Sequence, residues 1–137
     1  MPDPKPPITA ELIWTGELQF GVTTGRNALI LDGNSTAGPS PMQLLAVAIA
    51  GCMAADVVSI VEKGRHPLKG LRASVTCERL PEPPRRLTRV TLHFHITGAV
   101  PREAAQRAVD LSRDKYCSAW NSIRADVPLH TQVDIVP

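Results

Sequence analysis

The chain has 137 residues, the size of one ordinary domain, and carries a formal net charge of only +2. A charge this small excludes a protein that binds nucleic acid or a membrane surface mainly through electrostatics. Apolar residues at 43% exclude wholesale disorder, and aromatic residues at 4% are too few for a base-stacking platform. We therefore expect a single globular domain over residues 1–137.

The cysteine content indicates the cellular compartment. Three cysteines are an odd and sparse set, which argues against the disulfide framework of a small secreted protein. The proline-rich start has no apolar stretch behind it, so no signal peptide is visible. We expect a cytoplasmic protein in which each cysteine is core packing, a metal ligand or a working thiol.

The first third of the chain predicts a flexible tail followed by short strands. Residues 1–8 are rich in proline and read as a loose N-terminal tail. Apolar and β-tolerant runs at residues 10–14, 18–22 and 28–31 predict two or three strands, with turns at the glycines between them. A polar loop then leads to Ser40.

A long helix is predicted next. Ser40 is a natural N-cap, Pro41 suits the first helical position, and Gln43 stands where a capping box needs it. The stretch from residue 42 to 63 contains no proline, and Gly64 supplies a stop. The helix is apolar nearly all round, which would also fit a membrane span, but Asp56 in its middle and the amphipathic strands elsewhere favour a core helix.

The remaining chain alternates strands and helices in an order typical of the α+β class. Residues 71–78 and 90–97 alternate apolar and polar side chains, which predicts a half-exposed antiparallel pair. Helices are expected over residues 101–113 and about 116–124, and residues 129–136 close the chain as a strand. Because strands and helices do not alternate singly, we expect antiparallel sheets around a long central helix.

Cys52, in the middle of the long helix, has two interpretations. A free cysteine is most often a small buried hydrophobic residue, but Gly51 before it is costly in a helix and often marks a close approach. Asp56 lies one turn later on the same face and would disfavour a thiolate. A reactive Cys52 therefore needs a cation from elsewhere, for which Arg26 in a turn is the candidate, held by Asp56 or Gln43.

The other cysteines and the histidines leave fewer possibilities. Cys117 lies in polar surroundings at a predicted helix start, where the helix dipole lowers the pKa of a thiol. Cys77 continues the apolar side of its strand and reads as packing. His93 and His95 share one strand face, which permits two metal ligands, but no further ligand spacing accompanies them, so we expect no metal and place them in solvent or at an interface.

Taken together, these features resemble the OsmC/Ohr family of osmotically inducible and organic hydroperoxide resistance proteins, in a less characterised branch. The resemblance extends from about residue 10 to the end of the chain. It is carried by residues 40–45 with Cys52 beyond them, by residues 56–60, by the strand at 92–94, and by residues 108–112 leading into 115–118.

The resemblance implies an intertwined homodimer whose two active sites lie at the interface. It implies that Cys52 is the peroxidatic thiol, that Cys117 is the resolving thiol, and that Arg26 stabilises the thiolate and contacts the peroxide. A hydroperoxide substrate and a dithiol reductant of the lipoyl or thioredoxin kind follow, with no metal or organic cofactor.

One position departs from the family pattern. Well-known members carry a glutamate directly after the proline, which pairs with the arginine. Here Met42 and then Gln43 follow Pro41, and Gln43 can hydrogen-bond but adds no charge. Gln43, Met53 and Asp56 are the expected substrate-binding residues, and apolar neighbours such as Met53 suit an organic peroxide. The alternative is a non-catalytic or weakly active dimeric relative that binds a ligand or handles sulfur.

Overall fold

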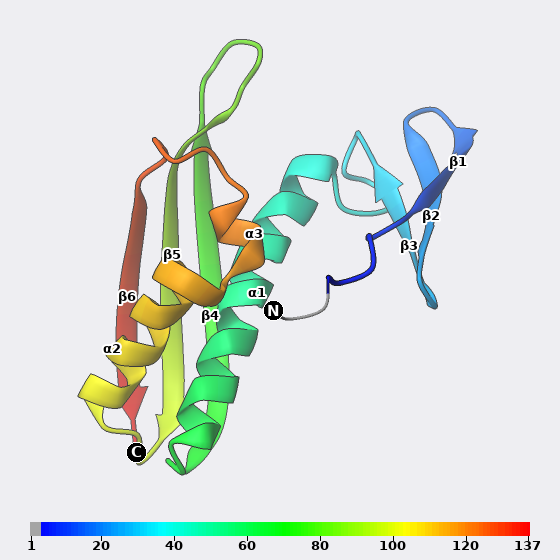
Figure 1. The fold of residues 1–137 in the computed structure, drawn as a ribbon. Helices are drawn as coiled ribbons and strands as arrows, with labels where there is room; N and C mark the ends of the chain where they lie inside the picture. Colours follow the sequence, from blue (N-terminus) through cyan, green and yellow to red (C-terminus); the bar gives the residue numbers. More distant parts are fainter. Residues whose placement is uncertain (1–3) are drawn as a thin grey trace. The chain divides into compact units, whose positions relative to one another are not determined.

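The computed structural model describes residues 4–137, which form two compact units (Figure 1). One unit ends at Leu45 and the other spans Ala46–Pro137. Each is described here by itself, and the single-domain interpretation stays a prediction. The predicted N-terminal tail lies partly outside the described residues, and its described part, residues 4–8, forms neither helix nor strand.

The first unit is a three-stranded antiparallel meander in the order β1-β2-β3, as its short apolar runs predicted. Its strands are β1 (Glu11–Gly16), β2 (Gln19–Thr24) and β3 (Asn27–Asp32). Gly25 has a φ of +58°, which lets the chain reverse between β2 and β3. On β1 the consecutive side chains of Leu12, Ile13 and Trp14 are 52%, 69% and 65% exposed, so the first unit by itself covers neither face of that strand.

Helix α1 (Pro41–Lys63) begins and ends where the sequence predicted. Its start is a capping box, in which the Gln43 amide donates to Ser40 Oγ at 3.2 Å and the Ser40 amide donates to Gln43 Oε1 at 2.9 Å. The helix is long and apolar enough to cross a membrane by length and composition, with 28% of its apolar window buried in the chain. Core helices of soluble proteins meet the same criterion, and the absence of a membrane span stays a prediction.

The second unit is built on the sheet β4-β5-β6, formed by β4 (Leu68–Arg79), β5 (Leu87–Gly98) and β6 (Leu129–Val136). Strands β4 and β5 pair antiparallel, as their alternation predicted. Strand β6 instead pairs parallel to β5, so the expectation of purely antiparallel sheets was wrong for this strand. The reason is the crossover, because the helices between β5 and β6 return the chain to the start of the sheet before β6 begins.

The crossover contains α2 (Arg102–Leu111), the π-helical turn η1 (Ser112–Tyr116) and the short α3 (Ser118–Asn121). The predicted helix over residues 101–113 therefore ends earlier, and the predicted turn near residues 116–124 is a single four-residue helix. In Figure 1, α1, α2 and α3 lie over one face of the sheet.

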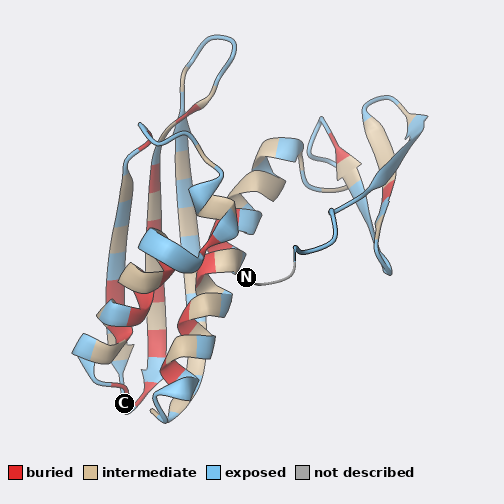
Figure 2. Ribbon diagram, in the orientation of Figure 1, coloured by how far each residue is buried: buried red, intermediate tan, exposed pale blue. Residues whose placement is uncertain are grey.

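The core of the second unit lies between these helices and the sheet. Figure 2 shows buried segments alternating along β5 and recurring along α1 and α2. On β5 the residues that face the helices, Leu92, Phe94 and Ile96, are at most 1% exposed. On α1 the buried residues recur about every four positions and form one stripe, made of Ile49, Ala50, Met53, Val57 and Val61.

Candidate functional site

The second unit brings Cys52 and Cys117 together, although they are far apart in the sequence. Cys52 lies half-buried in the middle of α1, and Cys117 is completely buried between η1 and α3. The two side chains are neighbours, and Cys52 is among the groups that raise the pKa of the Cys117 thiol. No disulfide joins the three cysteines.

Backbone hydrogen bonds on both sides hold Cys117 in place. The Cys117 amide donates to the Ser112 carbonyl at 2.8 Å, which closes the π-helical turn. The Cys117 carbonyl accepts from the Asn121 amide at 3.0 Å and from Asn121 Nδ2 at 2.9 Å. Cys117 Sγ itself accepts from the Trp120 amide at 3.3 Å, as the N-cap of α3. The thiol is therefore oriented by its own local structure.

Burial dominates the acidity of Cys117. Loss of solvent raises its pKa to about 11, and the neighbouring Cys52 and the Asp56 carboxylate act in the same direction. The Trp120 amide opposes this, but its hydrogen bond is the smaller effect. The sequence had predicted a lowered pKa in polar surroundings, and that prediction was wrong because the polar neighbours in sequence point outward while the thiol points into the core.

Asp56 and Ser112 form a polar contact beside the two thiols. Ser112 Oγ donates to Asp56 Oδ2 at 2.8 Å, and Ser112 is completely buried. Asp56, predicted to face Cys52 from one turn away on α1, is thus joined to η1 and acts on Cys117 as well. Sequence reasoning did not single out Ser112, because a serine near the end of an amphipathic helix gives no signal of its partner across the fold.

A groove opens next to Asp56 within the second unit. It has a volume of about 580 Å³ and is lined by residues of α1, α2 and η1. Its polar lining includes Asp56, Lys63, Arg107 and Tyr116. The volume is in the range of small-molecule sites. A ligand of modest size therefore has room on the side of the thiol pair where Asp56 lies.

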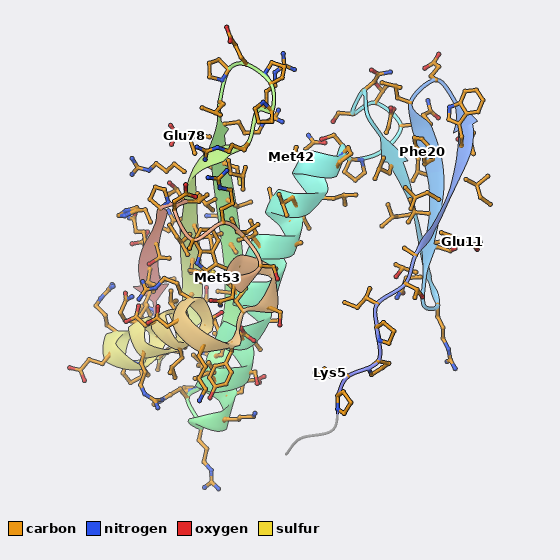
Figure 3. All side chains as sticks on the ribbon, turned by 45° about the horizontal axis from the view of Figure 1, so that its top comes forward. Lys5, Glu11, Phe20, Met42, Met53 and Glu78 are labelled. Carbon is orange, nitrogen blue, oxygen red and sulfur yellow. The ribbon has the colours of Figure 1, made fainter. Side chains whose placement is uncertain are left out.

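Met53 is a core residue in the structure. Figure 3 shows it near the middle of α1, and its side chain is completely buried. It lies next to Cys52 in the sequence and belongs to the buried stripe of α1. Its predicted contact with a substrate stays a prediction.

Gln43 and Arg26 belong to the first unit. Gln43 Oε1 accepts from the Ser40 amide and, at 2.6 Å, from Ser35 Oγ, so its side chain serves the cap of α1. Arg26 lies in the exposed turn between β2 and β3. The predicted pairing of Arg26 with Cys52 and Gln43 joins the two units and stays a prediction.

The remaining candidates lie on the sheet of the second unit. Cys77 is half-buried on β4, where burial raises its pKa, as expected for a packing residue. His93 and His95 lie on the face of β5 opposite to its buried residues. The structure adds Asp134 of β6 to this pair, with His93 Nε2 and Asp134 Oδ2 at 2.5 Å.

Comparison with known proteins places this site in a family. Residues 32–132 match the OsmC-like protein family, a span that includes both Cys52 and Cys117. Protein YhfA of Escherichia coli strain K12 is 44% identical over 132 residues, covering 94% of this chain and 98% of its own.

Solved structures agree with this placement. A hypothetical protein of Aquifex aeolicus is 25% identical with a TM-score of 0.90, covering 96% of this chain and 98% of its own. The organic hydroperoxide resistance protein OsmC of Legionella pneumophila shares the fold, at 20% identity and a TM-score of 0.69, covering 98% of this chain and all of its own. The match over residues 32–132 and the relationship to YhfA show that this chain belongs to the OsmC-like protein family.

Proposed function

We propose that the protein is a thiol-dependent peroxidase that reduces organic hydroperoxides with Cys52 and Cys117. The observation that carries the proposal is the placement of two free thiols side by side, one half-buried on α1 and one buried and oriented at η1. Family membership supports it, because members of the family include proteins named for organic hydroperoxide resistance.

Cys52 is assigned the first step because it is the more accessible of the two thiols. Its thiolate attacks one oxygen of the O–O bond, which breaks, so that Cys52 becomes a sulfenic acid and the alkoxide takes a proton to leave as an alcohol. Cys117 then attacks the sulfenic sulfur, the S–S bond forms, and the hydroxyl leaves with the thiol proton as water. The hydroperoxide is reduced by two electrons, which the two thiols supply.

Turnover requires a dithiol reductant, of the lipoyl or thioredoxin kind. One of its thiolates attacks the protein disulfide and forms a mixed disulfide, which frees one protein thiol. The second thiol of the reductant then attacks the mixed disulfide, so that the reductant leaves as an intramolecular disulfide and the other protein thiol is restored. Such reductants are kept reduced in the cytoplasm, which is the proposed location. Arg26 is proposed to stabilise the Cys52 thiolate with a positive charge. This charge would offset the negative charge of Asp56, which disfavours the thiolate. A substrate is proposed to approach Cys52 through the groove beside Asp56, one turn along α1.

We also propose that the functional form is a homodimer. On β1, Leu12, Ile13 and Trp14 are more than half exposed, and on α1 the exposed fraction of Val47 is 60%. Apolar side chains exposed on a sheet and on a helix in this way favour burial against another surface, and a second copy of the chain would supply that surface. Sedimentation equilibrium tests this directly, with a dimer mass expected and a monomer mass at micromolar concentration contradicting it.

The peroxidase proposal is tested by intact mass and free-thiol count after one equivalent of cumene hydroperoxide. The native chain is expected to lose two thiols and yield a linked peptide containing Cys52 and Cys117. Cys52→Ser should show no fast reaction, Cys117→Ser should stop at a sulfenic acid that dimedone traps, and Cys77→Ser is the matched control that behaves as native. Survival of all three thiols for minutes contradicts the proposal.

A second candidate function is ligand binding or sulfur handling without efficient peroxide turnover. It is favoured by Asp56 beside the thiol pair and by the engagement of Gln43 Oε1 in the cap of α1, where it accepts two hydrogen bonds. Arg26→Lys and Arg26→Gln distinguish the two functions. A peroxidase should lose most of its rate in Arg26→Gln, whereas a binder that reacts slowly with peroxide should react at the same slow rate in all three proteins.

A further inference from the structure

We propose that His93, His95 and Asp134 form a binding site for a divalent transition-metal ion, with Zn²⁺ as the ion of best fit. Each side chain offers one ligand atom, and the three ligand atoms all lie within 4.8 Å of one another. Two imidazole nitrogens and one carboxylate oxygen are ligands that Zn²⁺ and its neighbours in the first transition row prefer. The site departs from the sequence-based expectation of no metal.

The fold brings the three residues together from two strands. Parallel pairing of β6 with β5 places Asp134 in register with His95, and His93 lies two positions earlier on the same face of β5. The two imidazole rings stack with their centroids 3.8 Å apart, so they are already side by side. The sequence missed Asp134 because the parallel pairing of β6 was not predicted.

The distances require small side-chain shifts to accept an ion. Asp134 Oδ2 lies 2.5 Å from His93 Nε2 and 3.9 Å from His95 Nδ1. Tetrahedral Zn²⁺ with bonds near 2.0–2.1 Å separates its ligand atoms by about 3.3 Å. One contact must therefore widen by about 0.8 Å and the other close by about 0.6 Å. The His93 and His95 nitrogens, which lie within 4.8 Å of each other, must reach the same separation, and rotation of the side chains has to supply these shifts.

The exposure of the three ligand side chains and the charge of a neighbouring arginine determine how an ion would bind at this site. The side chains of His93, His95 and Asp134 are 28%, 31% and 52% exposed, so an ion bound by three protein ligands keeps a position for water. Arg72 of β4 lies opposite His95 in the register and places a positive charge nearby, which opposes a bound cation. Removal of this charge should tighten binding, a response that an unrelated surface histidine would not show.

The site lies on the sheet face opposite to the helices, whereas Cys52 lies on α1 over the other face. It is therefore independent of the thiol pair, and the inference does not rest on the proposed peroxidase activity. Because thiols also bind these ions, the test uses the full chain carrying Cys52→Ser and Cys117→Ser. Failure of the metal site and failure of the peroxidase proposal are thereby separate results.

The experiment titrates Zn²⁺ by calorimetry and Co²⁺ by its visible spectrum. One equivalent should bind with a Kd below about 10 µM, and the Co²⁺ spectrum should lack a thiolate charge-transfer band. Asp134→Asn and His93→Gln should each weaken binding by at least about 10-fold, because loss of a ligand costs no less than loss of its supporting partner. Arg72→Gln should bind several-fold more tightly.

His130→Gln is the matched control. His130 lies on the same face of β6 about 13 Å from Asp134, and its loss should leave binding unchanged. A Kd weaker than about 100 µM, equal binding by Asp134→Asn, or a thiolate band in the Co²⁺ spectrum overturns the proposal. Far-UV circular dichroism checks each variant, and Asp134→Asn, at an exposed position, decides the question if His93→Gln does not fold.

Discussion

Replacement of Ser112 by alanine tests whether the contact between η1 and α1 stabilises the site. Ser112 is completely buried, and its hydroxyl donates to Asp56 Oδ2 at 2.8 Å. A hydrogen bond to a charged group is worth about 1.5–3 kcal/mol. Asp56 is half-buried, so water replaces part of the lost donor, and alanine has the better helix propensity by about 0.5 kcal/mol. We expect Ser112→Ala to lower the free energy of unfolding by about 1–2 kcal/mol.

The assay is urea denaturation followed by far-UV circular dichroism at one fixed protein concentration, because a dimer makes stability depend on concentration. Ser122→Ala is the matched control, since Ser122 Oγ also donates at 2.8 Å, to the Ser118 carbonyl, but on the surface. It should change stability by less than about 0.5 kcal/mol.

A double-mutant cycle with Asp56→Asn isolates the pairwise contribution. The double variant should lose less stability than the sum of the two single variants, by about 1 kcal/mol. The reasoning is refuted if Ser112→Ala costs no more than Ser122→Ala, or if the two substitutions are additive.

Three further expectations concern Cys117 and two glycines. Burial raises the pKa of Cys117 to about 11 from an ordinary value of 9.0, so its contribution to stability is complete below pH 9 and is lost as the pH rises toward 11. Native protein should therefore lose more melting temperature between pH 8.5 and 10.5 than Cys117→Ala does, and equal losses contradict the raised pKa. Gly98 has a φ of +132°, and a Cβ there would lie 2.2 Å from the Pro67 carbonyl oxygen, so urea unfolding of Gly98→Ala should show a loss of at least about 2 kcal/mol; a smaller loss would refute the clash. Among the described residues, nothing beyond its chain neighbours and the helix backbone lies within 4 Å of a Cβ built at Gly51, but Gly51 lies one turn after Val47 on the face that the proposed homodimer covers. Urea unfolding of Gly51→Ala should therefore show a loss of stability, whereas a gain of about 1 kcal/mol from helix propensity would show that no second copy packs there.

Local sequence signals predicted the elements well where the chain alone determines them. Ser40 and Gln43 predicted the start of α1, because a capping box is satisfied within four residues. The alternation along β4 and β5 predicted both strands, because a half-buried strand must place every second side chain in the core. The position of Cys52 on α1 followed from the same local information.

Contacts between distant segments were decided by the tertiary structure. The parallel pairing of β6 depends on the route of the crossover, so neither the strand direction nor the approach of Asp134 to His93 was visible in the sequence. The burial of Cys117 depends on the π-helical turn before it, which local propensity does not signal, and that burial reversed the expected direction of its pKa. By itself the sequence determined where the helices and strands lie and which element holds each cysteine. Only the packing of the second unit decided which of them meet, because contacts between segments distant in the chain depend on how the elements pack.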